Sequence, residues 1–149
     1  QGSLENPNYA QVKRQISGHA ECVRIVYDSD QITLEQLLDH LFRIIDPTSR
    51  NRQGNDVGTS YRTGIYPACA EDEAIARQFV KERQKNYARP IVTEVERLVC
   101  FYDAEQEHQD YLVRHPQGYC HVDFSVMRPQ ERKAQREITG MRSDHVGSD

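Results

Sequence analysis

The chain has 149 residues, 37% of them hydrophobic, with a formal net charge of -4 and an isoelectric point near 5.9. A chain with this net negative charge lacks the excess of basic residues with which proteins bind nucleic acid. No apolar run approaches the roughly 20 residues that cross a bilayer. We therefore expect one domain with an ordinary core, and neither nucleic acid nor a membrane as a partner.

The first predicted element is a strand at residues 19–27, where apolar side chains alternate along both faces. We interpret it as an interior strand of a sheet. A helix follows, because Thr33 and Gln36 can form a capping box and apolar residues recur at helical spacing from Leu34 to Ile45. The helix should stop before Pro47, since proline pushes the residue before it out of helical geometry.

A polar loop at residues 51–60 comes next. Connections inside compact domains usually have about four to six residues, so this longer loop is either disordered or folded into a conformation that serves a function. Gly54 and Gly58 allow backbone angles that other residues resist, while Asp56 and its polar neighbours can bond the nearby main chain. The residue order favours an ordered functional loop.

The rest of the chain predicts a strand at 61–66, a helix at 71–87, a strand at 91–98 and a helix from Asp103 through residue 115. Alternating strands and helices are typical of the α/β or α+β classes. The last residues are strongly polar and poor in aliphatics. We therefore place the domain at 1–121 and a polar, flexible tail at 122–149.

The cysteines are spread along the chain, at Cys22, Cys69, Cys100 and Cys120. They form no C-x-x-C pair, which argues against a zinc ribbon or a thioredoxin-like motif, and a reducing cytoplasm suits them best. Three histidines near Cys120 also match no zinc pattern, so we expect no metal and no other cofactor. Cys120 itself follows a proline and a glycine in a segment able to move, which suits disulfide exchange.

Glu21 is the most informative single residue. In the predicted strand it shares a face with Val23 and Ile25, where loss of hydration disfavours the ionised carboxylate and should raise its pKa. A carboxylic acid that stays protonated near neutrality can donate a proton. The alternatives are that Glu21 lies at a solvent-exposed end of the sheet, or that its carboxylate forms an ion pair with Arg24 or Arg62.

Several sequence blocks together resemble the A-type peptide methionine sulfoxide reductases over residues 6–121: NPNY, SGHAE, IDPTSRNRQGNDVGTSYRTGIY, FYDAEQEHQDYL and HPQGYCH. The resemblance implies an α+β fold, a two-layer α/β sandwich with a ferredoxin-like core. It also implies an oxidoreductase that repairs oxidised proteins by reducing the S epimer of methionine sulfoxide, free or protein-bound. The implied route is thiol chemistry with a disulfide intermediate, which thioredoxin regenerates.

The resemblance also implies roles for single residues. Glu21 of GHAE matches the acid that bonds and protonates the sulfoxide oxygen, assisted by Tyr9 and Tyr61. Asp56 of QGND matches a residue that shapes the substrate and redox-partner site, and we group it with His19 and Tyr61 as substrate-binding. These assignments agree with the elevated pKa expected for Glu21 from its strand position.

Cys120 of GYC matches the resolving cysteine, which captures the sulfenic acid left on the nucleophile. The nucleophile of the family lies in a GCFWG motif, and the 149 residues contain neither that motif nor any tryptophan. We expect the leading strand and helix of the fold to be missing, the chain alone to be inactive, and apolar surface to be exposed.

VKRQISG, at 12–18, also replaces the frequent VCSGxTG. The alternative function is a non-catalytic sulfoxide-binding or structural module on the same scaffold.

Overall fold

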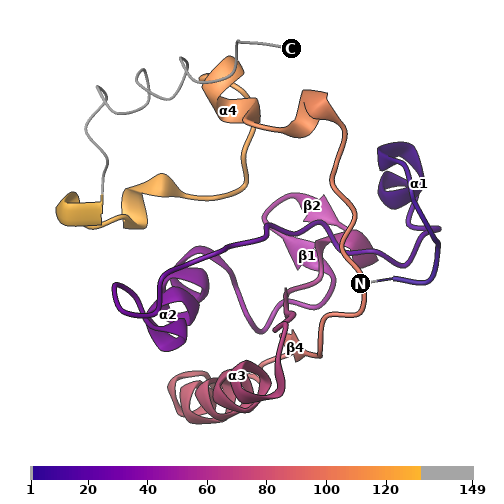
Figure 1. The fold of residues 1–149 in the computed structure, drawn as a ribbon. Coiled ribbons are helices and arrows are strands. Elements are labelled where there is room, and N and C mark those ends of the chain that lie inside the picture. Colours follow the sequence, from indigo (N-terminus) through magenta and orange to yellow (C-terminus); the bar gives the residue numbers. More distant parts are fainter. Residues whose placement is uncertain (1, 132–149) are drawn as a thin grey trace, which may run out of the picture.

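The structure, a computed structural model, describes residues 2–131 (Figure 1). The helices of this part are α1 (Tyr9–Lys13), α2 (Leu34–Ile44), α3 (Ala70–Arg83) and α4 (Tyr111–Arg114). The strands are β1 (Arg52–Gln53), β2 (Asp56–Val57), β3 (Gly64–Ile65) and β4 (Glu94–Val95). Figure 1 shows α2 and α3 close together at one end of the molecule and α4 at the other. Among the helices described here, none has the length and apolar character of a membrane span.

Helix α2 begins with the capping box that the sequence predicts. The backbone N–H of Gln36 donates to Thr33 Oγ1 (3.2 Å), and the backbone N–H of Thr33 donates to Gln36 Oε1 (2.8 Å). The helix buries Leu38 and Phe42 on the face where apolar residues recur. It ends shortly before Pro47, so this prediction is confirmed at both ends.

Helices α2 and α3 share one core with the β3–β4 pair. The rings of Phe42 and Phe79 meet edge to face, with centroids 5.2 Å apart. Such a pair stabilises the fold by about 0.5–1.5 kcal/mol beyond the area it buries. Ile65 of β3 and Val95 of β4 lie opposite each other in a parallel pair and belong to the same buried cluster. The packing therefore places both helices against the short parallel sheet.

Backbone hydrogen bonds continue this parallel pairing beyond its two-residue strands. The backbone N–H of Glu94 donates to the carbonyl of Thr63 (3.1 Å). In the same way, the N–H of Glu96 donates to the carbonyl of Ile65 (3.2 Å), and that of Leu98 to the carbonyl of Pro67 (2.9 Å). The strand predicted at 91–98 thus lies largely where the sequence placed it. Helices and small sheets in one chain are consistent with the predicted α+β class.

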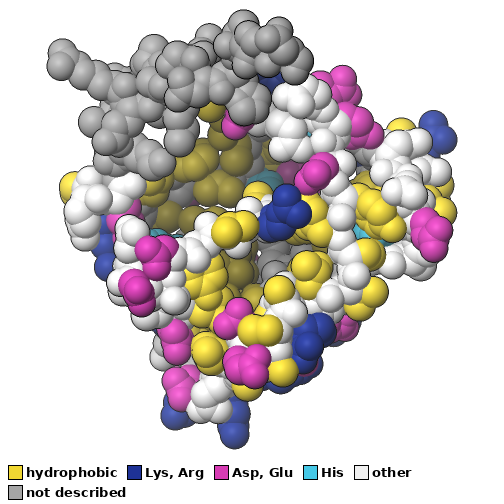
Figure 2. All heavy atoms as spheres, in the orientation of Figure 1, with side chains coloured by type: hydrophobic (Ala, Val, Ile, Leu, Met, Phe, Trp, Pro, Cys, Tyr) yellow, Lys and Arg dark blue, Asp and Glu magenta, His cyan; other side chains and the backbone are white. Residues whose placement is uncertain are grey.

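The interior strand predicted at residues 19–27 is wrong. This segment runs across the molecule without regular structure and joins neither sheet of the described residues (Figure 1). Val23 is 84% exposed and Val26 is 92% exposed. Alternation favours an extended chain, but a strand also needs a neighbour to share its backbone hydrogen bonds. The exposed apolar surface that the sequence predicts is therefore present at residues 19–27. Figure 2 shows further hydrophobic side chains in a hollow on one face of the molecule.

The last predicted helix is interrupted. A 3-10 turn covers Gln106–His108 and α4 covers Tyr111–Arg114. Asp110 lies between them with φ of 51°, in the left-handed region. A right-handed helix cannot continue through that conformation, although Asp tolerates it better than most residues. The continuous helix predicted from Asp103 is therefore wrong.

The end of the described chain contacts α2. Residues Phe124–Val126 and Pro129–Glu131 form two 3-10 turns. The two terminal guanidinium nitrogens of Arg43 donate to the carboxylate of Glu131, Nη2 at 2.9 Å and Nη1 at 3.1 Å. This bidentate geometry fixes Glu131 beside α2. The rest of the predicted tail, residues 132–149, lies outside the described residues.

Acid should release this contact. Hydrogen bonds from Arg43 and from the Arg128 backbone lower the pKa of Glu131 from its ordinary value of 4.5 to about 2. Because the folded pKa is the lower one, the contact stabilises the fold fully above pH 4.5 and is lost as pH falls through about 2. We expect the amide NMR signal of Phe124 to shift across that range. The shift should disappear in Glu131→Gln, and an unchanged titration in that variant would contradict the assignment.

Candidate functional site

The polar loop at 51–60 is ordered. Strands β1 and β2 form a hairpin in which Gln53 lies opposite Asp56, and Gly54 makes the turn with φ of 56°. The backbone N–H of Gly58 then donates to the carbonyl of Asn51 (2.8 Å) and closes the base of the loop. A 3-10 turn at Thr59–Tyr61 follows. The prediction that this stretch is ordered is confirmed, and its functional role stays a prediction.

Glu21 lies beside the end of this loop. Its backbone N–H donates to the carbonyl of Ser60 (2.8 Å). Loss of hydration raises the pKa of the Glu21 carboxyl, and the carboxylate of Asp56 raises it further. His108, His121 and Lys13 oppose this shift. The residue is exposed overall, so the shift comes from protein atoms gathered around one carboxyl group.

The elevated pKa thus has the predicted direction but a different origin from the predicted one. In the described residues Glu21 belongs to neither sheet; its backbone bonds the loop end at Ser60, and Asp56 of the loop acts on its carboxyl. Of the alternative ion-pair partners, Arg62 donates to Glu94 (2.6 Å), and the guanidinium of Arg24 stacks on the ring of Phe101 at 4.8 Å.

Asp56 connects this loop to the segment that carries Cys120. The hydroxyl of Tyr119 donates to Asp56 Oδ2 (3.3 Å), and Nδ1 of His121 lies 3.4 Å from the same oxygen. Both neighbours of Cys120 in the sequence are therefore in contact with Asp56. The thiol of Cys120 is free and half-buried. The charges of Asp56 and His121 both act on the Glu21 carboxyl, so the loop, Glu21 and the segment next to Cys120 lie near one another although they are far apart in the sequence.

The other proposed site residues differ in how they are placed. Tyr61 ends the 3-10 turn, and its backbone N–H donates to the carbonyl of Gly58 (3.0 Å). Tyr9 is the first residue of α1, but the position of its side chain lies outside what the structure describes. His19 is buried, with Nε2 at 2.8 Å from the carbonyl of Leu4. Its role in binding substrate stays a prediction.

Sequence reasoning missed three residues that contact this site: Gln15, Tyr119 and His121. The position of Tyr119 and His121 on either side of Cys120 is the signal that could have found them. Over residues 2–131, no group of three or more His, Cys, Asp or Glu side chains is arranged to hold a metal ion.

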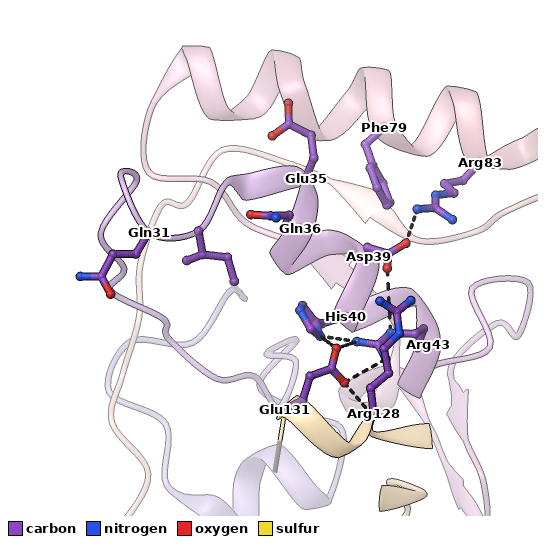
Figure 3. Close-up of a pocket in the computed structure, with 11 residues that line it drawn as sticks. Gln31, Glu35, Gln36, Asp39, His40, Arg43, Phe79, Arg83, Arg128 and Glu131 are labelled. Carbon is purple, nitrogen blue, oxygen red and sulfur yellow. Dashed lines mark hydrogen bonds and ion pairs between the residues drawn. The ribbon is translucent and has the colours of Figure 1, made fainter. Parts of the chain in front are cut away.

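A pocket of about 450 Å³ lies elsewhere, between α2, α3 and the turn at Pro129–Glu131 (Figure 3). None of the proposed site residues lines it. Arg83 is paired with Asp39, and Arg43 is paired with Glu131. These charges neutralise one another within the protein, so the pairs stabilise the packing of α2, α3 and the turn at Pro129–Glu131.

Comparison with known proteins decides the family. The family model described as peptide methionine sulfoxide reductase matches residues 1–139. The chain belongs to this family. A peptide methionine sulfoxide reductase MsrA from Clostridium botulinum is 51% identical over 121 residues, which cover 81% of this chain and 77% of the relative. The MsrA of Mycoplasma genitalium is 48% identical over the same length, with the same coverage.

Solved structures agree with the sequence comparison. Reduced Mxr1 from Saccharomyces cerevisiae superposes with a TM-score of 0.74 at 39% sequence identity. The match covers 76% of this chain and 62% of Mxr1, so the chain spans less than two thirds of that protein. The predicted family and the predicted α+β class are both confirmed, and the family is one of oxidoreductases named for reducing methionine sulfoxide.

Proposed function

We propose that this chain acts in the reduction of the S epimer of methionine sulfoxide, free or in oxidised proteins. One observation carries the proposal: a carboxyl with an elevated pKa, that of Glu21, lies at the loop whose Asp56 also holds the Cys120 segment. This arrangement gathers an acid for the sulfoxide oxygen and a thiol for the step that follows. Tyr9 and Tyr61 are the phenols proposed to assist Glu21.

The reaction requires these two groups in sequence. A thiolate attacks the sulfoxide sulfur and forms an S–S bond, and the S–O bond breaks as the oxygen, protonated by Glu21, leaves as water. A water molecule then attacks the cysteine sulfur, the S–S bond breaks, and methionine leaves with both bonding electrons while the cysteine becomes a sulfenic acid. Cys120 then attacks the sulfenic sulfur, which releases water and forms a disulfide. A dithiol reductant returns both cysteines to thiols. We propose thioredoxin for this step.

The attacking thiol is proposed to come from a segment that carries GCFWG, which the 149 residues lack. Cys22 follows Glu21 directly and is exposed, but loss of hydration raises the pKa of its thiol and so lowers the thiolate fraction at neutral pH. The free thiols of Cys22, Cys69 and Cys120 support a reducing compartment, and we place the protein in the cytoplasm.

The test compares the chain alone with a fusion in which a GCFWG-bearing segment from a family member precedes Gln1. With dithiothreitol, we expect no turnover by the chain alone, and reduction of the S epimer but not the R epimer by the fusion. The matched control is the same fusion with the GCFWG cysteine replaced by serine, which should be inactive.

One result would overturn the proposal, and a second would change the nucleophile proposed for it. A folded fusion that binds the sulfoxide without reducing it would support the non-catalytic module instead. Turnover by the chain alone that is lost in Cys22→Ser or Cys69→Ser would assign the nucleophile to one of those thiols.

A further inference from the structure

Gln15 binds the end of the polar loop with both ends of its amide. Its Oε1 accepts hydrogen bonds from the backbone N–H of Ser60 (2.9 Å) and from the hydroxyl of Thr59 (2.8 Å). Its Nε2 donates to Oγ of Ser60 (3.0 Å), and Ser60 is completely buried. One side chain thus satisfies the polar groups of two successive loop residues.

The backbone around these bonds is unusual at two positions. Gln15 has φ of 64°, in the left-handed region that L residues rarely adopt. Gly58 has φ of 140°, and a Cβ there would lie 2.0 Å from Nε2 of Gln15. Glycine at 58 therefore makes room for the amide. Such a conformation persists only where the surrounding contacts hold it, as they do for Gln15 here.

These bonds continue to the proposed acid. The carbonyl of Ser60, whose N–H and hydroxyl are held by Gln15, accepts the backbone N–H of Glu21 (2.8 Å). Tyr61 is the next residue along the chain. In the VKRQISG stretch, Gln15 also stands at the glycine position of VCSGxTG, so this chain has an amide where that pattern has no side chain.

We propose that Gln15 is a positioning residue, which fixes residues 58–61 and, through Ser60, the backbone of Glu21. This inference rests on the proposed role of Glu21 in sulfoxide reduction. Gln15 touches no reacting group; it acts by holding the loop end to which Glu21 is bonded.

The test uses Gln15→Gly in the 149-residue chain. Glycine accepts the left-handed backbone without strain, so the variant removes the amide and leaves the local fold intact. We expect hydrogen exchange of the Ser60 and Glu21 amides to become about tenfold faster or more, while the amides of Phe42 and Phe79 in the core keep their rates. In the same variant, the pKa of Glu21 should fall toward its ordinary value, because a looser loop readmits water.

The matched control is Gln84→Ala. Gln84 also holds a loop with both ends of its amide, accepting from Ile91 N–H (2.8 Å) and donating to the carbonyls of Tyr87 and Arg89. Loss of the Gln84 amide should speed hydrogen exchange of the Ile91 amide. It should leave both the exchange rate of the Ser60 amide and the titration of Glu21 unchanged.

Unchanged exchange at Ser60 and Glu21 in Gln15→Gly would overturn the inference. Faster exchange with an unchanged Glu21 titration would overturn it as well, because the amide would then hold the loop without affecting the acid. Neither readout needs turnover, so these outcomes stay distinct from a failure of the proposed reductase function.

Discussion

Glu21→Gln should lower the rate of S-sulfoxide reduction by roughly 100-fold or more in the fusion that carries the nucleophile, the scale of a lost general acid. Glutamine keeps the size of the side chain and can still donate a hydrogen bond to the sulfoxide oxygen. It cannot transfer a proton, so the oxygen would have to leave as a much poorer leaving group. The effect should fall on the chemical step and leave substrate binding nearly unchanged.

Single-turnover kinetics across pH would measure this loss. In the unsubstituted fusion the rate should fall as pH rises through the elevated pKa of Glu21, because the acid must be protonated to act. Glu21→Gln should lack that decline. Glu35→Gln, an exposed carboxyl on α2, is the matched control and should retain both the rate and its pH dependence. A rate in Glu21→Gln close to that of the unsubstituted fusion would remove Glu21 from the mechanism.

Cys120→Ser should stop the fusion after a single turnover when thioredoxin is the reductant. The nucleophile would remain as a sulfenic acid, because no thiol held beside Asp56 could convert it to a disulfide. Two measurements would test this: the amount of methionine formed per molecule of the fusion, and the mass of the fusion with its nucleophile trapped as a sulfenic acid.

Cys100→Ser provides the control for this prediction. Cys100 also carries a half-buried thiol, but it follows the strand segment at 91–98 and should be dispensable. Repeated turnover with thioredoxin in Cys120→Ser would show that another thiol resolves the intermediate.

The sequence predicts α2 well because the signals are local. Thr33 and Gln36 lie three positions apart and bond each other through side chain and backbone, so the capping box needs no distant partner. The segment at 19–27 shows the opposite case. Its alternation is clear, but a strand depends on a neighbour that no local pattern supplies, and Val26 is left exposed.

Part of the site was predictable and part was not. The apolar face suggested an elevated pKa for Glu21, and the glycines suggested an ordered loop around Asp56. Their proximity arises from tertiary structure, as do the bonds from Gln15 to Ser60 and from Tyr119 to Asp56. Such contacts join residues far apart in the sequence, and spacing carries no information about them.

The most direct test of this account is the titration of the Glu21 carboxyl in the 149-residue chain, followed by NMR of its side-chain carbon. We expect a pKa above the ordinary value of 4.5, and we expect it to fall in Asp56→Asn, which removes the neighbouring negative charge. A Glu21 carboxyl that titrates at or below 4.5 would contradict its role as the acid.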